Sequence, residues 1–267
     1  MIRKLTYSVQ ELMPYVNWVY FYHAWGLSGK PEAERLAMKS EAEKLCRTVG
    51  RDIHVRALFG LFEANSDGDD IIVGDVRMPM LRQQHPTKAG DGHCLCLADF
   101  VRPLSSGVKD QVGVFATSVD AAMEKGYSAD PYMRMLSQTM ADRLAEAAVE
   151  KLHEEVRKTF WGYAPNEQLS IEQMLREEFQ GIRPAVGYPS MPDTSLNFLL
   201  SDLIGMKSIG IRLTQSGMMQ PHASVSGLML AHPQAHYFDV GKVGEDQLRD
   251  YARRRGLPLQ VMRMFIK

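Results

Sequence analysis

The longest regular pattern in the sequence is a stripe of apolar residues that recurs every three or four positions over residues 131–160. It consists of Met133, Leu136, Met140, Leu144, Ala148, Leu152, Val156 and Phe160. This spacing places the apolar side chains on one face of an α-helix, which at 1.5 Å per residue would span roughly 45 Å. The other face is charged, with Glu154 and Lys158 as an i,i+4 pair and His153 expected to be solvated. The sequence therefore predicts one long amphipathic helix.

Shorter elements surround this helix in groups. Strands are predicted over 55–62, 71–78, 95–101, 112–119, 209–215, 225–231 and 237–243. Further helices are predicted over 31–50, 170–181, 195–204, 245–254 and 257–265. The turn composition Asn-Ser-Asp-Gly at 65–68 indicates a hairpin-like return between the first two strands. Because strands and helices do not alternate strictly, the expected fold class is α+β rather than parallel βαβ.

The bulk properties exclude several classes of function. A net charge of -1 gives no general drive toward nucleic acid or a membrane surface. No apolar run approaches the roughly 18 residues of a membrane span, and no signal peptide is apparent. The cysteines Cys46, Cys94 and Cys96 suit a reducing cytoplasm, and their spacing does not predict a metal site. No repeat or linker divides the chain, so residues 1–267 are expected to form one domain.

The most distinctive segment is residues 181–193, which contain three prolines and two glycines and must adopt an irregular, rigid backbone. Such a loop suits a ligand, because little conformational entropy remains to be lost on binding. Arg183 can form two parallel hydrogen bonds to a carboxylate, the Ala185 amide can donate, and Tyr188 offers a flat face. The alternative is a packed surface loop whose arginine pairs with a local acidic residue, which is the commoner situation.

Two other stretches carry weaker signals. The small residues within 219–227 allow a backbone or a flat ligand to approach a strand closely, although small residues also fill tight sheet–helix contacts. Tyr237 begins a predicted strand and could stack on an adenine ring, but an aromatic in this position is more often part of the core.

Other functional motifs are incomplete or absent in the sequence. Asp91-x-His93 is similar to the Asp-x-His-x-x-Gly loop whose histidine binds the cobalt of cobalamin, but Cys96 stands where that loop needs glycine. The sequence has no glycine-rich phosphate or dinucleotide motif. It also lacks the Gly-x-Ser-x-Gly elbow of serine hydrolases.

Seven segments, in order along the chain, resemble the C-terminal activation domain of cobalamin-dependent methionine synthase. They are LADFV at 97–101, ADRLAEA at 141–147, WGYAPNE at 161–167, RPAVGYP at 183–189, ASVSG at 223–227, HP at 232–233 and DYARR at 250–254. The resemblance covers nearly the whole chain. It implies a single C-shaped α+β domain with a central twisted antiparallel sheet and surrounding helices.

The resemblance also implies an activity. The domain would hold S-adenosylmethionine against cobalamin that has oxidised to its inactive cobalt(II) form, so that the cobalamin is reductively methylated. The implied partners are the cobalamin-binding domain of methionine synthase and flavodoxin or a flavoprotein reductase. This chain lacks the modules that bind homocysteine, folate and cobalamin, so it cannot make methionine alone. It is either a fragment or a separate protein that acts on a partner, and a start at Met1 favours the latter.

The resemblance assigns roles to particular positions. The implied ligand-binding set is Asn17, Glu146, Arg183, Pro184, Ala185, Tyr237 and Phe238. Arg183 would bind the methionyl carboxylate of S-adenosylmethionine, and the backbone at Ala185 would help to fix the ligand. Tyr188 would face the corrin and take part in catalysis only by positioning. No general base is required, because the sulfonium methyl group is already activated.

Four positions depart from the family pattern. Asn17 stands where many relatives have Asp, and it loses a charge that would attract the ligand. Gln220 and His222 replace a Trp and a Gly, and Thr194 stands where a His is common. The changes at Asn17, Gln220 and His222 leave open a non-catalytic regulatory protein that binds S-adenosylmethionine. A further alternative is an activator of another corrinoid methyltransferase.

Overall fold

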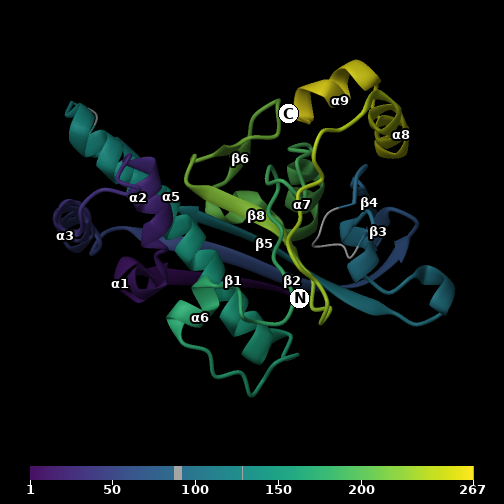
Figure 1. The fold of residues 1–267 in the computed structure, drawn as a ribbon, viewed down its shortest axis with the longest axis horizontal. Helices are drawn as coiled ribbons and strands as arrows, with labels where there is room; N and C mark the ends of the chain where they lie inside the picture. The colour runs from purple at the N-terminus through teal and green to yellow at the C-terminus, as the bar shows by residue number, and fades with distance from the viewer. Residues whose placement is uncertain (87–91, 128, 267) are drawn as a thin grey trace.

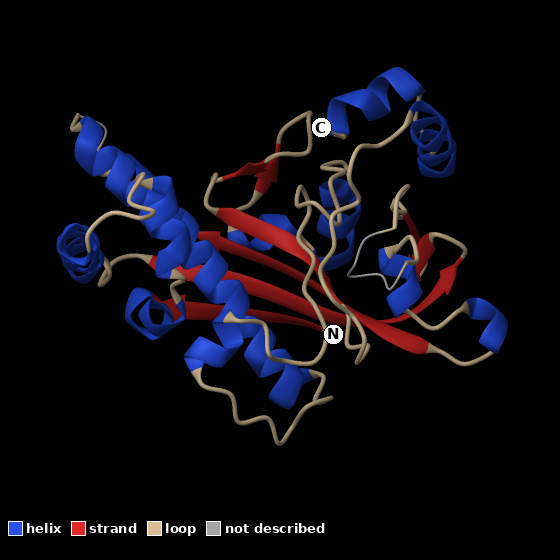
Figure 2. Cartoon of the chain, in the orientation of Figure 1, coloured by secondary structure: helices blue, strands red, loops and turns tan. Residues whose placement is uncertain are grey.

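The computed structural model describes residues 1–86, 92–127 and 129–266, and at its centre one long helix crosses an antiparallel sheet (Figure 1). The sheet has the order β4-β3-β2-β5-β8, and β1 pairs with β2 beside β3. Its strands are β1 (Ile2–Ser8), β2 (His54–Asp67), β3 (Asp70–Val73), β4 (Val76–Pro79), β5 (Asp110–Val119) and β8 (Ser224–Met229). A separate short hairpin joins β6 (Arg212–Leu213) to β7 (Met219–Gln220). Figure 2 shows the strong twist of the sheet, and the predicted α+β class is confirmed.

Helices cover both faces of the sheet. They are α1 (Val9–Leu12), α2 (Trp18–Ala24), α3 (Glu32–Val49), α4 (Ala122–Lys125), α5 (Pro131–Glu155), α6 (Ile171–Leu175), α7 (Leu196–Ile204), α8 (Glu245–Arg255) and α9 (Leu259–Phe265). Side chains alternate across the strands, so Phe59 and Phe115 join the core under α5, whereas Leu58 and Val114 join the core under α7 and α8. The sheet thus separates two hydrophobic cores.

The long helix begins where the sequence predicts. Asp130 caps it by accepting hydrogen bonds from the backbone amides of Tyr132 and Met133, and Pro131 occupies the first turn. The α-helical part ends at Glu155, and a wider π-helical turn, Val156–Phe160, completes the predicted length. The predicted contact between Glu154 and Lys158 forms at 3.3 Å between carboxylate and ammonium.

The prediction for His153 is wrong, because its side chain is fully buried. After the π-helical turn the chain folds back over this face of α5, which places Phe179 edge-on to the His153 ring at 4.8 Å between centroids. The hydroxyl of Tyr163 lies 3.1 Å from His153 Nε2. The long helix is therefore buried on more than the one face that its apolar stripe indicates.

Four predicted strands and one predicted helix differ from the structure. The strand predicted over 71–78 is broken by a turn at 74–75 into β3 and β4, which pair with each other. Residues 95–101 contain a 3₁₀ turn, Leu97–Phe100, because the Asp99 carboxylate accepts from the Cys96 amide at 2.8 Å and tightens the backbone. Of 209–215 only Arg212–Leu213 pairs, and 237–243 forms no regular strand. The helix predicted over 170–181 stops at Leu175, because Glu177 adopts a left-handed φ of 60° that reverses the chain.

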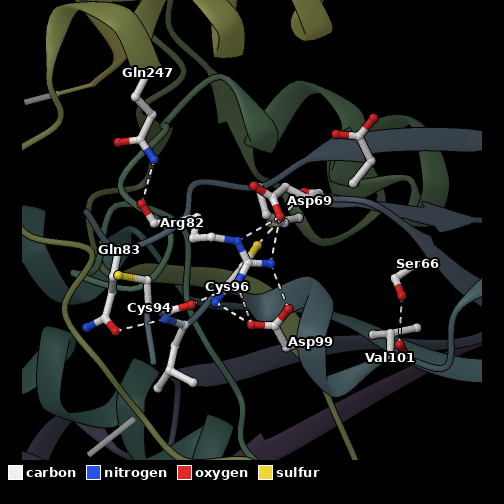
Figure 3. Close-up of polar contacts among 12 residues, drawn as sticks. Ser66, Asp69, Arg82, Gln83, Cys94, Cys96, Asp99, Val101 and Gln247 are labelled. Carbon is white, nitrogen blue, oxygen red and sulfur yellow. Dashed lines mark hydrogen bonds and ion pairs between the residues drawn. The ribbon is translucent and has the colours of Figure 1, made fainter. Parts of the chain in front are cut away.

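A charge network joins Arg82 to Asp69 and to Asp99 of the 3₁₀ turn (Figure 3). The Arg82 guanidinium binds the carboxylates of Asp69 and Asp99 at 2.6 and 2.7 Å. The side-chain amide of Gln247, from α8, donates to the Arg82 carbonyl at 2.5 Å. One arginine therefore ties together the β3–β4 end of the sheet, the 3₁₀ turn and the C-terminal helices.

None of the helices in these described ranges is both long and apolar enough to cross a membrane.

Candidate ligand-binding site

The motif segment 183–189 runs along the outer edge of β8. The Leu228 amide donates to the Pro184 carbonyl at 3.0 Å, and Ala185 faces Gly227 across a β-bridge. A Cβ at Gly227 would collide with the Pro184 carbonyl, so only glycine permits this approach. Because Ala185 and Gly227 form a non-hydrogen-bonded pair, the Ala185 amide points away from β8. The small residues on β8 thus serve to seat the motif segment.

A cavity of about 680 Å³ opens between this segment, α5 and the residues after position 236. This volume suits a small organic ligand, for which pockets of roughly 300–1,000 Å³ are usual. All eight residues singled out from the sequence line it, namely Asn17, Glu146, Arg183, Pro184, Ala185, Tyr188, Tyr237 and Phe238. The structure therefore brings together positions that are up to 221 apart in the sequence.

Other lining residues were not anticipated. They include Tyr15, Tyr20, Arg143, Glu150, Glu177 and Asp239. Glu150 had a readable signal, because it follows Glu146 by one i,i+4 step on the predicted helix, and the two side chains must share a face. No sequence signal indicated Glu177, because its position in the cavity wall depends on the reversal of the chain after α6.

Arg183 is the most constrained side chain of the cavity, with 11% of it exposed. Its guanidinium Nη2 pairs with the Glu150 carboxylate, and its backbone amide donates to the Tyr237 hydroxyl at 3.0 Å. Its Nη1 is buried and has no hydrogen-bond partner among the residues that the structure describes. The arginine therefore pairs with an acidic residue, as one sequence interpretation expects, and its role in binding a ligand carboxylate stays a prediction.

The carboxylates of α5 shape the electrostatics of the cavity. Burial raises the pKa of the Glu150 carboxyl, although the Arg183 charge opposes that shift and Glu146 adds to it. Burial and the nearby Glu146 charge also raise the pKa of Tyr188, so the Tyr188 phenol is neutral at pH 7 and donates a hydrogen bond to Glu146.

Asn17 lies at the start of α2, where its side-chain oxygen accepts from the Val19 amide at 3.1 Å. The residue is therefore a helix cap as well as part of the cavity wall. The substitution of Asp by Asn keeps this cap, because both side chains provide the accepting oxygen.

A second cavity of about 380 Å³ adjoins the first and shares Arg143, Glu146, Tyr188 and Val225 with it. Two of the departures from the family pattern, Thr194 and His222, line this second cavity. The His222 ring nitrogen Nδ1 lies 3.1 Å from the Asp142 carboxylate.

The comparison with known families is decisive. Residues 8–256 match the family described as the vitamin B12 dependent methionine synthase, activation domain. The chain belongs to this family. The crystal structure of the MetH reactivation domain bound to AdoHcy is similar to it, with a TM-score of 0.91 and 36% sequence identity, over 99% of this chain and 89% of that chain. The resemblance that the seven segments indicate is confirmed, together with the fold that it implies.

Within this activation domain, the described residues contain no group of three or more His, Cys, Asp or Glu side chains that could hold a metal ion. Asp91, of the histidine-loop comparison, lies outside the described residues. Burial raises the pKa of the Cys46 and Cys96 thiols to about 12, so both are protonated at neutral pH and poor metal ligands.

Proposed function

We propose that this activation domain binds S-adenosylmethionine in the larger cavity and presents it to cobalamin carried by a partner, so that inactive cobalt(II) cobalamin is reductively methylated. The observation that carries the proposal is the buried Nη1 donor of Arg183, which lacks an acceptor among the described residues. A buried, charged donor without an acceptor is costly. A ligand carboxylate supplies the missing acceptor.

The other predicted residues suit the rest of the ligand. The Ala185 amide points away from β8, and Ala185, Tyr237 and Phe238 line the same cavity as Arg183. Glu146 and Glu150 add negative charge, which favours a ligand that carries ammonium and sulfonium groups. The AdoHcy bound in the similar MetH domain is the demethylated form of this ligand and supports the assignment.

The residues of this chain act by binding and orienting. S-adenosylmethionine would supply an activated methyl group and the partner's reduced cobalt would accept it, with one electron from flavodoxin or a flavoprotein reductase. Arg183 and the Ala185 backbone would hold the donor, and Tyr188, 47% exposed between the two cavities, would meet the corrin. Alignment of two reactants of this kind can supply most of the rate enhancement without a general base.

The proposal includes a cytoplasmic location and the cobalamin-binding domain of methionine synthase as the partner. The free cysteines Cys46, Cys94 and Cys96 agree with a reducing compartment. Acting on a separate chain would make the reaction depend steeply on partner concentration, because no linker raises the effective concentration of the corrin.

A mixture of the chain, a cobalamin-loaded partner, a flavodoxin reducing system and methyl-labelled S-adenosylmethionine tests the proposal. We expect methylcobalamin to form only when all components are present, as followed by absorbance. The methyl group of that methylcobalamin should carry the label. Methylation of homocysteine by this chain alone, without cobalamin, would contradict the proposal.

A second candidate is a non-catalytic regulatory protein that binds S-adenosylmethionine. It is favoured by the substitutions Thr194 and His222 in the second cavity, because His222 engages the Asp142 carboxylate that the cavity would otherwise present to a partner. Binding of S-adenosylmethionine in calorimetry, without cobalamin methylation by any partner, would support this candidate. Methylation of the corrinoid subunit of another methyltransferase would instead assign that enzyme as the partner.

A further inference from the structure

A second buried arginine lies behind the cavity. Arg157 belongs to the π-helical turn at the end of α5, and its side chain is completely buried. Its Nε and Nη2 bind the Glu167 carboxylate at 2.8 and 2.6 Å, in a two-pronged contact. Because the Glu167 side chain is only 7% exposed, the pair is a fixed part of the interior rather than a surface ion pair.

The ring of Phe179 connects this arginine to the cavity. The Arg157 guanidinium carbon lies 4.3 Å from the ring centroid, and that of Arg183 lies 5.4 Å from the same centroid. The His153 ring meets Phe179 edge-on at 4.8 Å. One aromatic ring is thus in contact with two guanidinium groups, of which one is anchored at Glu167 and the other faces the ligand cavity.

The chemistry of this cluster favours a defined arrangement. Two like charges near one ring repel each other, and the carboxylates of Glu167 and Glu150 each neutralise one of them. The face of an aromatic ring attracts a guanidinium group, most strongly where water is excluded. The Glu150 contact uses Nη2 of Arg183, and the Phe179 ring is a second contact, which acts on the plane of the guanidinium and with it on the direction of Nη1.

We infer that Phe179, anchored by Arg157, is a positioning residue: it sets the orientation of Arg183 and thereby the affinity of the cavity for the carboxylate end of its ligand. The inference rests on the proposed function in so far as the ligand carries a carboxylate. The alternative is that Phe179 only fills apolar space and that Glu150 alone holds Arg183.

Two ligands that differ only in the carboxylate separate these alternatives. Calorimetry compares S-adenosylmethionine with decarboxylated S-adenosylmethionine in the wild type, F179L and F179Y. F179L keeps apolar volume but removes the aromatic face, whereas F179Y retains that face. We expect F179L to bind S-adenosylmethionine about tenfold more weakly, as suits the loss of a buried cation–π contact, and to bind the decarboxylated ligand as the wild type does. F179Y should restore the affinity.

A matched control removes an aromatic ring elsewhere. Phe198 packs edge-on against Phe265 and does not line the larger cavity, so F198L should leave both affinities unchanged. Equal weakening of both ligands by F179L, or full S-adenosylmethionine affinity in F179L, would overturn the inference.

If the wild type binds neither compound, that result contradicts the proposed function. A measurement without ligand then still tests the role of Phe179. In the free wild-type protein, NMR should show the Arg183 Nε–H resonance as a single signal protected from exchange with water. F179L should broaden or average this signal and F179Y should keep it. An unchanged Arg183 signal in F179L would show that the ring does not orient the guanidinium.

Discussion

The phenol of Tyr188 donates a hydrogen bond to the carboxylate of Glu146, and both residues line the two adjoining cavities. The pair therefore forms part of the boundary between them. Tyr188 comes from the irregular motif segment and Glu146 from α5, so the boundary joins the two elements that define the larger cavity.

The first prediction concerns Tyr188. Because Tyr188 lines both cavities and its hydroxyl is bound to Glu146 rather than to Arg183, Y188A should change S-adenosylmethionine affinity by less than about threefold and slow cobalamin methylation at least about tenfold, through loss of alignment. Calorimetry and the reactivation assay give the two values. Y132A, at an exposed tyrosine that contacts Glu41 on α3, is a matched control and should affect neither. A large loss of affinity in Y188A would place Tyr188 on the donor instead.

The second prediction concerns Arg183. Removal of its charge-assisted contact in R183A should weaken S-adenosylmethionine binding by about 2 kcal/mol, about thirtyfold. R183A also leaves the buried Glu150 carboxylate without a partner, which destabilises the fold. The double variant R183A/E150Q removes that stranded charge and should regain thermal stability but not affinity. Calorimetry that gives wild-type affinity for R183A would remove Arg183 from the site.

The third prediction reverses one departure from the family. N17D should bind S-adenosylmethionine more tightly than the wild type, because it adds a negative charge to the cavity wall facing a cationic ligand. The gain should shrink as salt rises, and calorimetry at low and high ionic strength measures it. The helix α2 should stay intact, since Asp caps as well as Asn. Unchanged or weaker binding would mean that position 17 is not electrostatically coupled to the ligand.

The fourth prediction follows from the burial of His153. Desolvation first, and then the charges of Arg183 and Arg157, lower the pKa of His153 well below 6.5 in the folded protein. The unfolded chain binds a proton at this residue as the pH falls below about 6.5, whereas the folded protein does not. The stability that the neutral residue contributes is therefore present above this pH and is lost below it.

The variant H153Q does not titrate in this range and provides the comparison. The difference in unfolding free energy between wild type and H153Q should fall by about 1.4 kcal/mol from pH 7.5 to pH 5.5. Urea unfolding at the two pH values measures it. A difference that stays constant with pH would mean that the pKa of His153 is the same in the folded and unfolded protein.

The long helix, the central strands and the cavity residues were predictable for different reasons. The helix over 131–160 follows from spacing alone. The eight cavity residues follow from the family resemblance: five of them lie in the seven segments, and Asn17, Tyr237 and Phe238 come from the family pattern outside those segments. Composition and spacing do not reveal which distant loops meet. The residues 237–243 illustrate the limit. They are predicted as a strand, but the Tyr237 hydroxyl accepts a hydrogen bond from the Arg183 amide, and the segment pairs with no strand in the described parts of the chain.

The positions that sequence reasoning missed depend on long-range returns of the chain. His153 looks solvated on a helical projection, because the residues near it in the sequence do not indicate that Phe179 covers it in the fold. Glu177 and Phe179 lie in a predicted helix that ends early, since the left-handed backbone at Glu177 turns the chain back toward α5. Tertiary packing, rather than local propensity, decides these placements.

The π-helical turn Val156–Phe160 works as a one-residue insertion in a helix. Shortening this turn by one residue would restore ordinary α-helical spacing and rotate everything that follows by about 100° around the helix axis. The Trp161–Phe179 return would then begin from the wrong side of α5, and the ring that touches Arg183 would no longer reach it. The position of the site residues after α5 therefore depends on the length of this turn, and a single-codon deletion there would disable the cavity although it changes the identity of no residue that lines it.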